Sequence, residues 1–200
     1  MERLGIYGGT FSPPHNGHIH AAKVFLREMA LDRLLVVPTS IPPHKARTEE
    51  TSAQARLAMC RLAFSFSESI EVSDMEIRRQ GFSYTSDTLR ELTQKNRQLF
   101  FLCGTDMLLT LDCWHEPETI FALADIVCMA RENDGTVRAA LEEKAKFYRK
   151  KYSARVHLLS SSAVEQSSSD VRAAMKKGNA WEDMLAPSVV SFIKREGLYR

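Results

Sequence analysis

The sequence lacks any apolar run long enough to span a bilayer, and its opening residues, Met1 to Gly5, contain no apolar leader segment. It also lacks an excess of charge, because 27 Lys and Arg stand against 25 Asp and Glu, a formal net charge of +2. A charge balance this close to neutral gives no support for a membrane or a nucleic-acid partner. We therefore expect any basic site to be confined to a few residues.

Cysteine pairs of the C-x-x-C type are also absent, which argues against a zinc site. Of the four cysteines, Cys60, Cys103 and Cys128 stand in apolar runs, where thiols are usually buried. This use of cysteine is typical of a reducing compartment, so we expect a cytoplasmic protein without a dedicated metal site.

Neither of the two common glycine-rich phosphate motifs is present. There is no G-x-G-x-x-G fingerprint of a dinucleotide site and no G-x-x-x-x-G-K-[ST] loop. The pair Gly8-Gly9 still permits a tight turn and a close approach of the backbone to a ligand. Taken alone, that pair is weak evidence for a phosphate site.

Short apolar strands alternate with amphipathic helices along the 200 residues, a length that suits one domain. Strands are predicted at residues 4–7, 34–38, 70–72, 98–103, 125–130 and 156–159, with residues 73–79 extending the third. Helices are predicted from residue 16 and at 52–64, 106–111, 139–150, 167–177 and 187–195, and residues 84–88 are expected to lead into a helix through Leu89 and Leu92. This alternation predicts a doubly wound α/β fold, a parallel sheet with helices on both faces, in a single domain spanning residues 1–200.

Polar residues of phosphate-binding type follow the ends of several predicted strands. They are Gly8, Gly9, Thr10, His15 and His18 after the first, Thr39, His44 and Lys45 after the second, Gly104 and Asp106 after the fourth, and residues 167–172 after the last. Ligands of such sheets bind beyond the carboxyl ends of the strands, near the point where strand order reverses. We therefore expect these residues to meet in one site.

His15 and His18 stand three residues apart at the start of a helix, so both rings can lie on one face. The same helix end offers unpaired N–H groups and the positive end of the helix dipole. An isolated pair of this kind would more often cap a turn and pack beneath a loop. The preceding residues 8–14 favour an anion cradle instead.

Residues 8–18, GGTFSPPHNGH, resemble the H-x-G-H signature of the nucleotidyltransferase superfamily, in the long form typical of bacterial nicotinate mononucleotide adenylyltransferases. Other segments resemble further motifs of that family, in order: IPPHK at 41–45, SYTSDTL at 83–89, GTD at 104–106, Trp114, SSSDVR at 167–172 and the tail at 198–199. The resemblance covers nearly the whole chain and implies a Rossmann-like fold. It also implies transfer of an adenylyl group from ATP to nicotinate mononucleotide, with release of pyrophosphate and no covalent intermediate.

The resemblance further implies roles for individual residues. Those expected to hold the ATP phosphates during catalysis are His15, His18, Lys45 and Arg172. Those expected to line the ATP site are Gly8, Gly9, Thr10, Phe11, Gly104, Asp106, Ser168 and Ser169. Those expected around the acceptor are Tyr84, Thr85, Trp114, His115 and Arg131, with the Trp114 indole stacked on the pyridine ring. Mg²⁺ is expected to arrive with ATP.

Three positions depart from the family pattern: Ser12 where Asp is common, Ser169 where Thr is common, and His115 where an aromatic such as Tyr is frequent. Only His115 bears on the expected acceptor pocket. Phosphopantetheine and nicotinamide mononucleotide stay open as acceptors, as does a non-catalytic nucleotide sensor on the same fold. The sequence also leaves open whether the protein forms a homo-oligomer.

Overall fold

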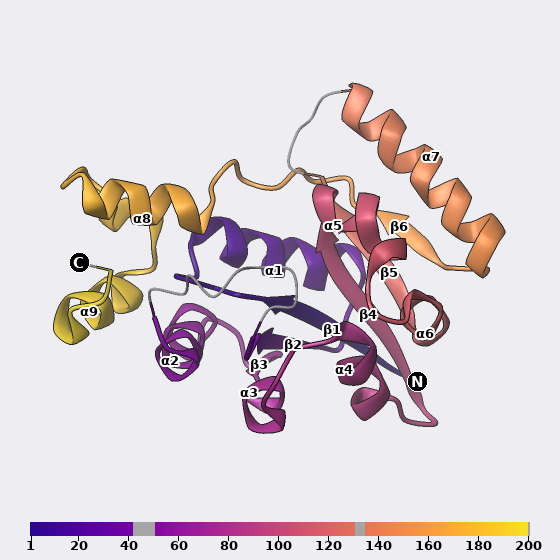
Figure 1. Cartoon of the computed structure of the whole chain (residues 1–200), viewed down its shortest axis with the longest axis horizontal. Coiled ribbons are helices and arrows are strands. Elements are labelled where there is room, and N and C mark those ends of the chain that lie inside the picture. The colour runs from indigo at the N-terminus through magenta and orange to yellow at the C-terminus, as the bar shows by residue number, and fades with distance from the viewer. Residues whose placement is uncertain (42–50, 131–134, 200) are drawn as a thin grey trace.

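The computed structural model describes residues 1–41, 51–130 and 135–199. At its centre is a six-stranded sheet in the order β3-β2-β1-β4-β5-β6, with neighbouring strands parallel (Figure 1). The strands are β1 (Glu2–Gly9), β2 (Arg33–Pro38), β3 (Ile70–Val72), β4 (Arg97–Gly104), β5 (Ala124–Met129) and β6 (Val156–Leu158). Strand order reverses between β1 and β4, the two central strands.

Helices cover both faces of this sheet. One face carries α1 (Asn16–Glu28), α2 (Ala53–Ala63), α8 (Ser168–Lys176) and α9 (Pro187–Glu196). The other carries α3 (Met75–Arg79), α4 (Thr85–Leu92), α5 (Thr105–Thr110), α6 (Pro117–Leu123) and α7 (Gly135–Tyr152). Two short 3₁₀ turns, η1 (Leu111–Cys113) and η2 (Glu182–Met184), follow α5 and α8.

Burial on both faces explains why the strands read as continuous apolar runs. In β4, Phe100 and Leu102 pack toward α1 and α2, whereas Phe101 and Cys103 pack toward α5. Every residue of β5 is buried. The doubly wound, Rossmann-like α/β class predicted from the sequence is therefore confirmed.

The expectation that residues 73–79 extend the third strand is wrong. β3 is an edge strand that pairs with β2 through three residues only, and the chain leaves the sheet after Val72. Met75 and Glu76 then turn into the interior as the start of α3. An ion pair between Asp74 and Arg78, with Oδ1 and Nε 2.7 Å apart, has the spacing that supports one helical turn.

Helix α6 was not predicted, although Pro117 in its first turn is a recognised start signal. The three cysteines expected to be buried, Cys60, Cys103 and Cys128, are buried free thiols, and Cys113 is exposed. Among the described helices, none is both long and apolar enough to cross a membrane.

Candidate active site

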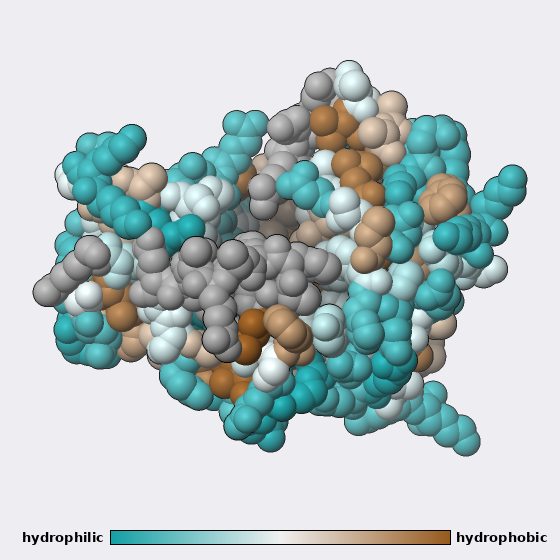
Figure 2. Space-filling view, in the orientation of Figure 1, coloured by the Kyte–Doolittle hydropathy of each residue, from teal (hydrophilic) through white to brown (hydrophobic). Residues whose placement is uncertain are grey.

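Two cavities open beside the carboxyl ends of β1 and β4, at the place where strand order reverses. The first has a volume of about 230 Å³ and the second about 370 Å³. Gly8, Gly9, Asp106 and Met107 line both cavities, so the two meet at these residues. In the space-filling view a hollow lies near the centre of this face, with apolar groups gathered over α5 (Figure 2). A ligand made of two joined halves can therefore lie across the switch point.

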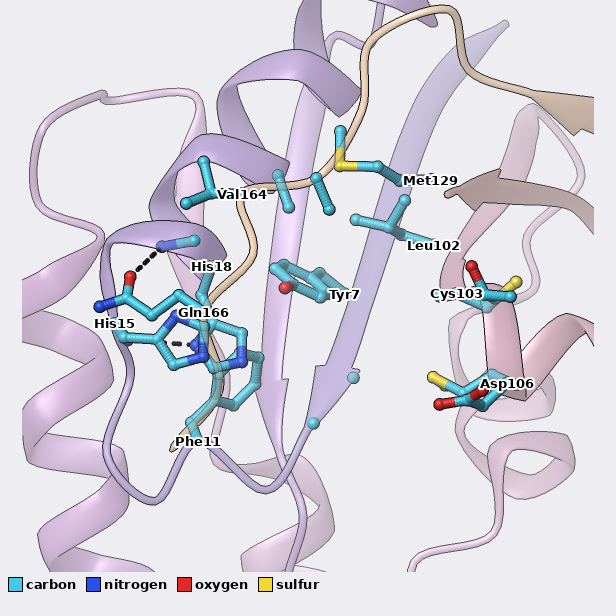
Figure 3. Close-up of a pocket in the computed structure, with 18 residues that line it drawn as sticks. Tyr7, Phe11, His15, His18, Leu102, Cys103, Asp106, Met129, Val164 and Gln166 are labelled. Atoms are coloured by element: carbon cyan, nitrogen blue, oxygen red, sulfur yellow. Dashed lines mark hydrogen bonds between the residues drawn. The ribbon is translucent and has the colours of Figure 1, made fainter. Parts of the chain in front are cut away.

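The two histidines expected to bind phosphate lie together in the first cavity. His15 is the N-cap residue of α1, and its ring centroid is 3.7 Å from that of His18. Asp106 faces them from the start of α5 across the cavity (Figure 3). Of the other predicted residues, Gly8, Gly9, Phe11 and Gly104 also line this cavity.

A hydrogen bond within this pair fixes the tautomer of His18. The backbone N–H of His15 donates to Nδ1 of His18 at 3.1 Å. A ring nitrogen that accepts a hydrogen bond carries no proton, so the proton of the neutral ring lies on Nε2. His18 therefore offers an N–H donor of defined position to an anion in the cavity.

The Phe11 ring packs against the His18 ring. It is 2% exposed and makes edge contacts with Tyr7 and His18, at centroid distances of 5.3 and 4.9 Å. A Cβ added to Gly9 would come within 3.0 Å of the Phe11 ring, so only glycine lets the backbone pass this close. This contact accounts for Gly9, whereas a Cβ at Gly8 would make only ordinary contact with the Phe101 ring at 3.9 Å.

Arg56, which the sequence reasoning missed, holds the loops that follow β1 and β2. Its guanidinium is fully buried and donates to the carbonyl oxygens of Thr10 at 2.9 Å and Ser40 at 3.2 Å. It stands on α2 among residues such as Leu57 and Cys60 that pack into the core. A single arginine on an otherwise apolar helix face was the available signal.

The serine and arginine candidates of α8 line neither cavity. Arg172 instead donates from Nη1 to the Ser12 carbonyl oxygen at 2.7 Å, and the Ser168 hydroxyl donates to the Pro13 carbonyl oxygen at 2.9 Å. Ser169 is exposed and accepts from Arg172 Nη2 at 3.2 Å. These side chains hold the backbone of the loop that leads into the histidines.

The second cavity gathers the candidates for the acceptor. Tyr84, Thr85, Trp114 and His115 all line it. The rings of Tyr84 and His115 lie face to face, with centroids 4.1 Å apart and planes 31° apart, and half-buried Trp114 meets the Phe101 ring edge-on. Thr10, expected in the ATP site, lines this second cavity instead.

Thr39, which was expected near the site from its place after a strand, and Glu76, which was assigned no role from the sequence, also line the second cavity. The Thr39 hydroxyl is buried without a hydrogen-bond partner among the described residues. Burial raises the pKa of the Glu76 carboxyl, an effect opposed by the Thr88 hydroxyl, which donates to Oε1 at 2.6 Å. Thr88 in turn accepts from Arg79 Nη2 at 2.8 Å, and this network fixes the start of α4 beside the cavity.

Lys45 and Arg131, like His44, lie outside the described residues, so their expected roles stay predictions. Within the described ranges, no three His, Cys, Asp or Glu side chains converge as a set of metal ligands. Any divalent cation in these cavities would therefore need most of its ligands from a bound phosphate.

Comparison with known proteins identifies the relatives of this chain. Residues 6–174 match the family model described as cytidylyltransferase-like. A protein of Desulfitobacterium hafniense (strain Y51), named a probable nicotinate-nucleotide adenylyltransferase, is 36% identical over 100% of this chain and 96% of its own. One of the same name from Desulfatibacillum aliphaticivorans is 34% identical over 98% and 99%. The structure of Plasmodium falciparum nicotinic acid mononucleotide adenylyltransferase complexed with NaAD shares the fold, with a TM-score of 0.76 at 19% identity, over 100% of this chain and 98% of that one.

Proposed function

We propose a function from the premise that this chain belongs to the cytidylyltransferase-like family and, within it, to the nicotinate-nucleotide adenylyltransferases. It transfers the adenylyl group of ATP to nicotinate mononucleotide, giving nicotinate adenine dinucleotide and pyrophosphate for NAD biosynthesis. The observation that carries this function is the junction of two cavities at the switch point, one with a histidine pair and one with an aromatic wall. The buried free thiols suit the reducing cytoplasm, where we place the reaction.

In this assignment ATP occupies the first cavity and the acceptor the second, with the reacting phosphates beside Gly8 and Gly9. An oxygen of the acceptor phosphate attacks the α-phosphorus of ATP. The new P–O bond forms as the bond from the α-phosphorus to the bridging oxygen breaks, and pyrophosphate leaves with that oxygen. Because no side chain bonds to phosphorus, the protein acts by positioning the two phosphates and stabilising their charge.

His18 is the donor that we assign to the α-phosphate. Its Nε2 carries the ring proton because Nδ1 accepts from the His15 N–H. Negative charge on the α-phosphate oxygens grows as the attacking oxygen approaches, and a fixed donor stabilises that charge without reorganising. His15, stacked on His18, completes the cradle at the positive end of α1.

The leaving pyrophosphate needs further cationic groups. We assign these to Lys45 and to Arg172, whose guanidinium already holds the Ser12 carbonyl beside the histidine loop. Ser168 and Ser169 add hydroxyls at the N-terminus of α8, where anions are favoured. Mg²⁺ bound to the ATP phosphates would neutralise part of their charge, with Asp106 the acidic side chain at the junction of the cavities.

On the acceptor side, the Trp114 indole offers a face to the pyridine ring, and Thr85 at the start of α4 offers a hydroxyl to its carboxylate. The paired Tyr84 and His115 rings close the same cavity. Arg131 is the remaining candidate for a charge that would attract the carboxylate.

The deciding experiment is pyrophosphate release from Mg-ATP with nicotinate mononucleotide, nicotinamide mononucleotide and phosphopantetheine in parallel. We expect strong preference for the first, because a site built for a carboxylate rejects the uncharged amide. Equal turnover of the first two would contradict the carboxylate site. Release with phosphopantetheine alone would overturn the acceptor, and no release with any acceptor would favour a nucleotide sensor.

A further inference from the structure

The proposed function gives no role to Gln166. Its side chain reaches the N-terminal end of α1, where His15 and His18 lie. It belongs to a connecting strap, residues 160–166, that follows β6 and runs along α1 from one end to the other. Ser160 and Ser161 contact Glu28 at the C-terminal end of α1, and the Ser162 carbonyl oxygen lies 3.1 Å from Nε2 of His20. Gln166 lies at the N-terminal end, among the residues that line the first cavity (Figure 3).

The Gln166 side chain makes a hydrogen bond on each side. Its Oε1 accepts from the backbone N–H of Gly17 at 3.2 Å, and its Nε2 donates to the Met184 carbonyl oxygen in η2 at 3.1 Å. The first N–H groups of a helix have no partner within the helix, and a side chain near the N-cap normally supplies one. Here the partner comes from a residue 149 positions further along the chain.

Gly17 is one of the two residues between the histidines, and a side chain there would be crowded. A Cβ added there would come within 3.0 Å of the His15 ring and 3.5 Å of the Val164 carbonyl oxygen. The Gly17 peptide is thus packed between an imidazole on one side and the strap on the other. Because Gly17 precedes His18 in the chain and lies beside the His15 ring, we expect a shift of this peptide to disturb the hydrogen bond from the His15 N–H to His18.

We propose that Gln166 is a positioning residue for the phosphate-binding histidines, acting by fixing the Gly17 peptide against η2. A second bond reinforces the same attachment, because Asn16 Nδ2 donates to the Asp183 carbonyl oxygen at 2.9 Å. Gln166 lines the first cavity but not the second. Its influence therefore falls on ATP and the α-phosphate rather than on the acceptor, an argument that rests on the proposed function.

The kinetic test uses Gln166→Met, which keeps the length of the side chain and removes both strong hydrogen bonds. We expect KM for Mg-ATP to rise and kcat to fall, each by about 10-fold, since sub-ångström misplacement of catalytic groups has effects of this order. KM for nicotinate mononucleotide should stay within about twofold. The matched control is Gln94→Met, at an exposed glutamine that precedes the amino end of β4, away from the cavities, and it should leave all three constants unchanged.

A second measurement does not depend on activity. In protein with ¹⁵N-labelled histidine, long-range ¹H–¹⁵N correlation spectra report which ring nitrogen of His18 is protonated, with the signal assigned from His18→Gln. We expect a single Nε2–H tautomer in the wild type and a tautomer mixture in Gln166→Met. Gln166→Glu keeps an oxygen acceptor for the Gly17 N–H but loses the bond to the Met184 carbonyl oxygen, so we expect a smaller share of the second tautomer than in Gln166→Met.

An unchanged His18 spectrum in Gln166→Met, together with an unchanged KM for ATP, would overturn the proposal. Equal rises of both KM values with a lowered unfolding temperature would also overturn it, because they would indicate a general structural role. If the wild type releases no pyrophosphate, the proposed function fails, and the spectra alone decide whether Gln166 orders the histidines.

Discussion

At His18, one backbone hydrogen bond determines which ring nitrogen can serve a ligand. The His15 N–H occupies Nδ1 at 3.1 Å and leaves Nε2 as the donor. Histidine is useful here as an oriented donor rather than as a base.

Replacing His18 with alanine tests this role. We expect kcat to fall by at least ~100-fold, the usual effect of losing a donor that acts in the transition state. The unfolding temperature should change little, because His18 is only partly buried. Near-normal turnover, measured as pyrophosphate release, would remove His18 from the mechanism.

Trp114→Ala tests the aromatic wall of the second cavity. The ring is half-buried and lines that cavity, so we expect KM for nicotinate mononucleotide to rise about 10-fold, in keeping with the 1–3 kcal/mol of an aromatic stack. KM for ATP should change much less, because Trp114 does not line the first cavity. Equal effects on both constants would assign Trp114 to the core instead.

Several motif residues, such as His15, His18 and Asp106, could be placed near one another from the sequence because the family pattern and the carboxyl ends of the strands coincide. Arg56 and Gln166 could not, because their partners lie 46 and 149 residues away along the chain. No periodicity or spacing reports a contact of that kind. The same limit applies to Arg172, which touches the Ser12 backbone 160 residues away and does not line either cavity.

Among the elements, α1 stands out because it is tethered at both ends by the strap. At its C-terminal end, Glu28 accepts hydrogen bonds from the backbone N–H and the hydroxyl of both Ser160 and Ser161. Burial alone would raise the pKa of the Glu28 carboxyl, but these four bonds outweigh it and lower the pKa to about 2. The ionised carboxylate is therefore the form that holds the strap.

Glu28→Gln should lower the free energy of unfolding near neutral pH by about 1–2 kcal/mol, since an amide nitrogen cannot accept the serine bonds. Because the folded-state pKa is depressed, this stability is fully present above the unfolded pKa of about 4.5 and is lost as pH falls toward 2. Denaturant unfolding across that range should show the variant and wild type converging in acid.

The exposed Glu68, in the connection between α2 and β3, provides the control. Glu68→Gln should match the wild type at every pH. A constant gap between Glu28→Gln and the wild type down to low pH would contradict the role of the ionised carboxylate.

The pattern of elements followed from the sequence wherever a strand or helix had its own periodicity and boundary signal. The prediction that residues 73–79 continue the third strand failed because the sequence of β3 does not indicate where an edge strand ends. Helix α6 is seven residues long, too short for an amphipathic pattern to show, and its proline signal was the only cue.

For the whole molecule, the sequence predicted the class of the sheet but not the order of its strands. Alternating elements predicted a parallel doubly wound sheet, whereas the order β3-β2-β1-β4-β5-β6 depends on which crossovers pack together. That order puts Gly9 and Gly104 at the ends of adjacent strands, and so brings the residues that line the two cavities to one junction. The site is thus a property of topology as much as of motif.

Residues far along the chain hold the histidine loop in place, and this has a consequence during synthesis of the protein on the ribosome. A ribosome adds about 5–20 residues per second, so Gln166 emerges roughly 10–30 s after Gly17, which it follows by 149 residues. During that interval the nascent chain carries both histidines without the strap that orders them. We therefore expect a translation product that stops before the strap to lack the contact between Gln166 and Gly17 that orders the histidine loop.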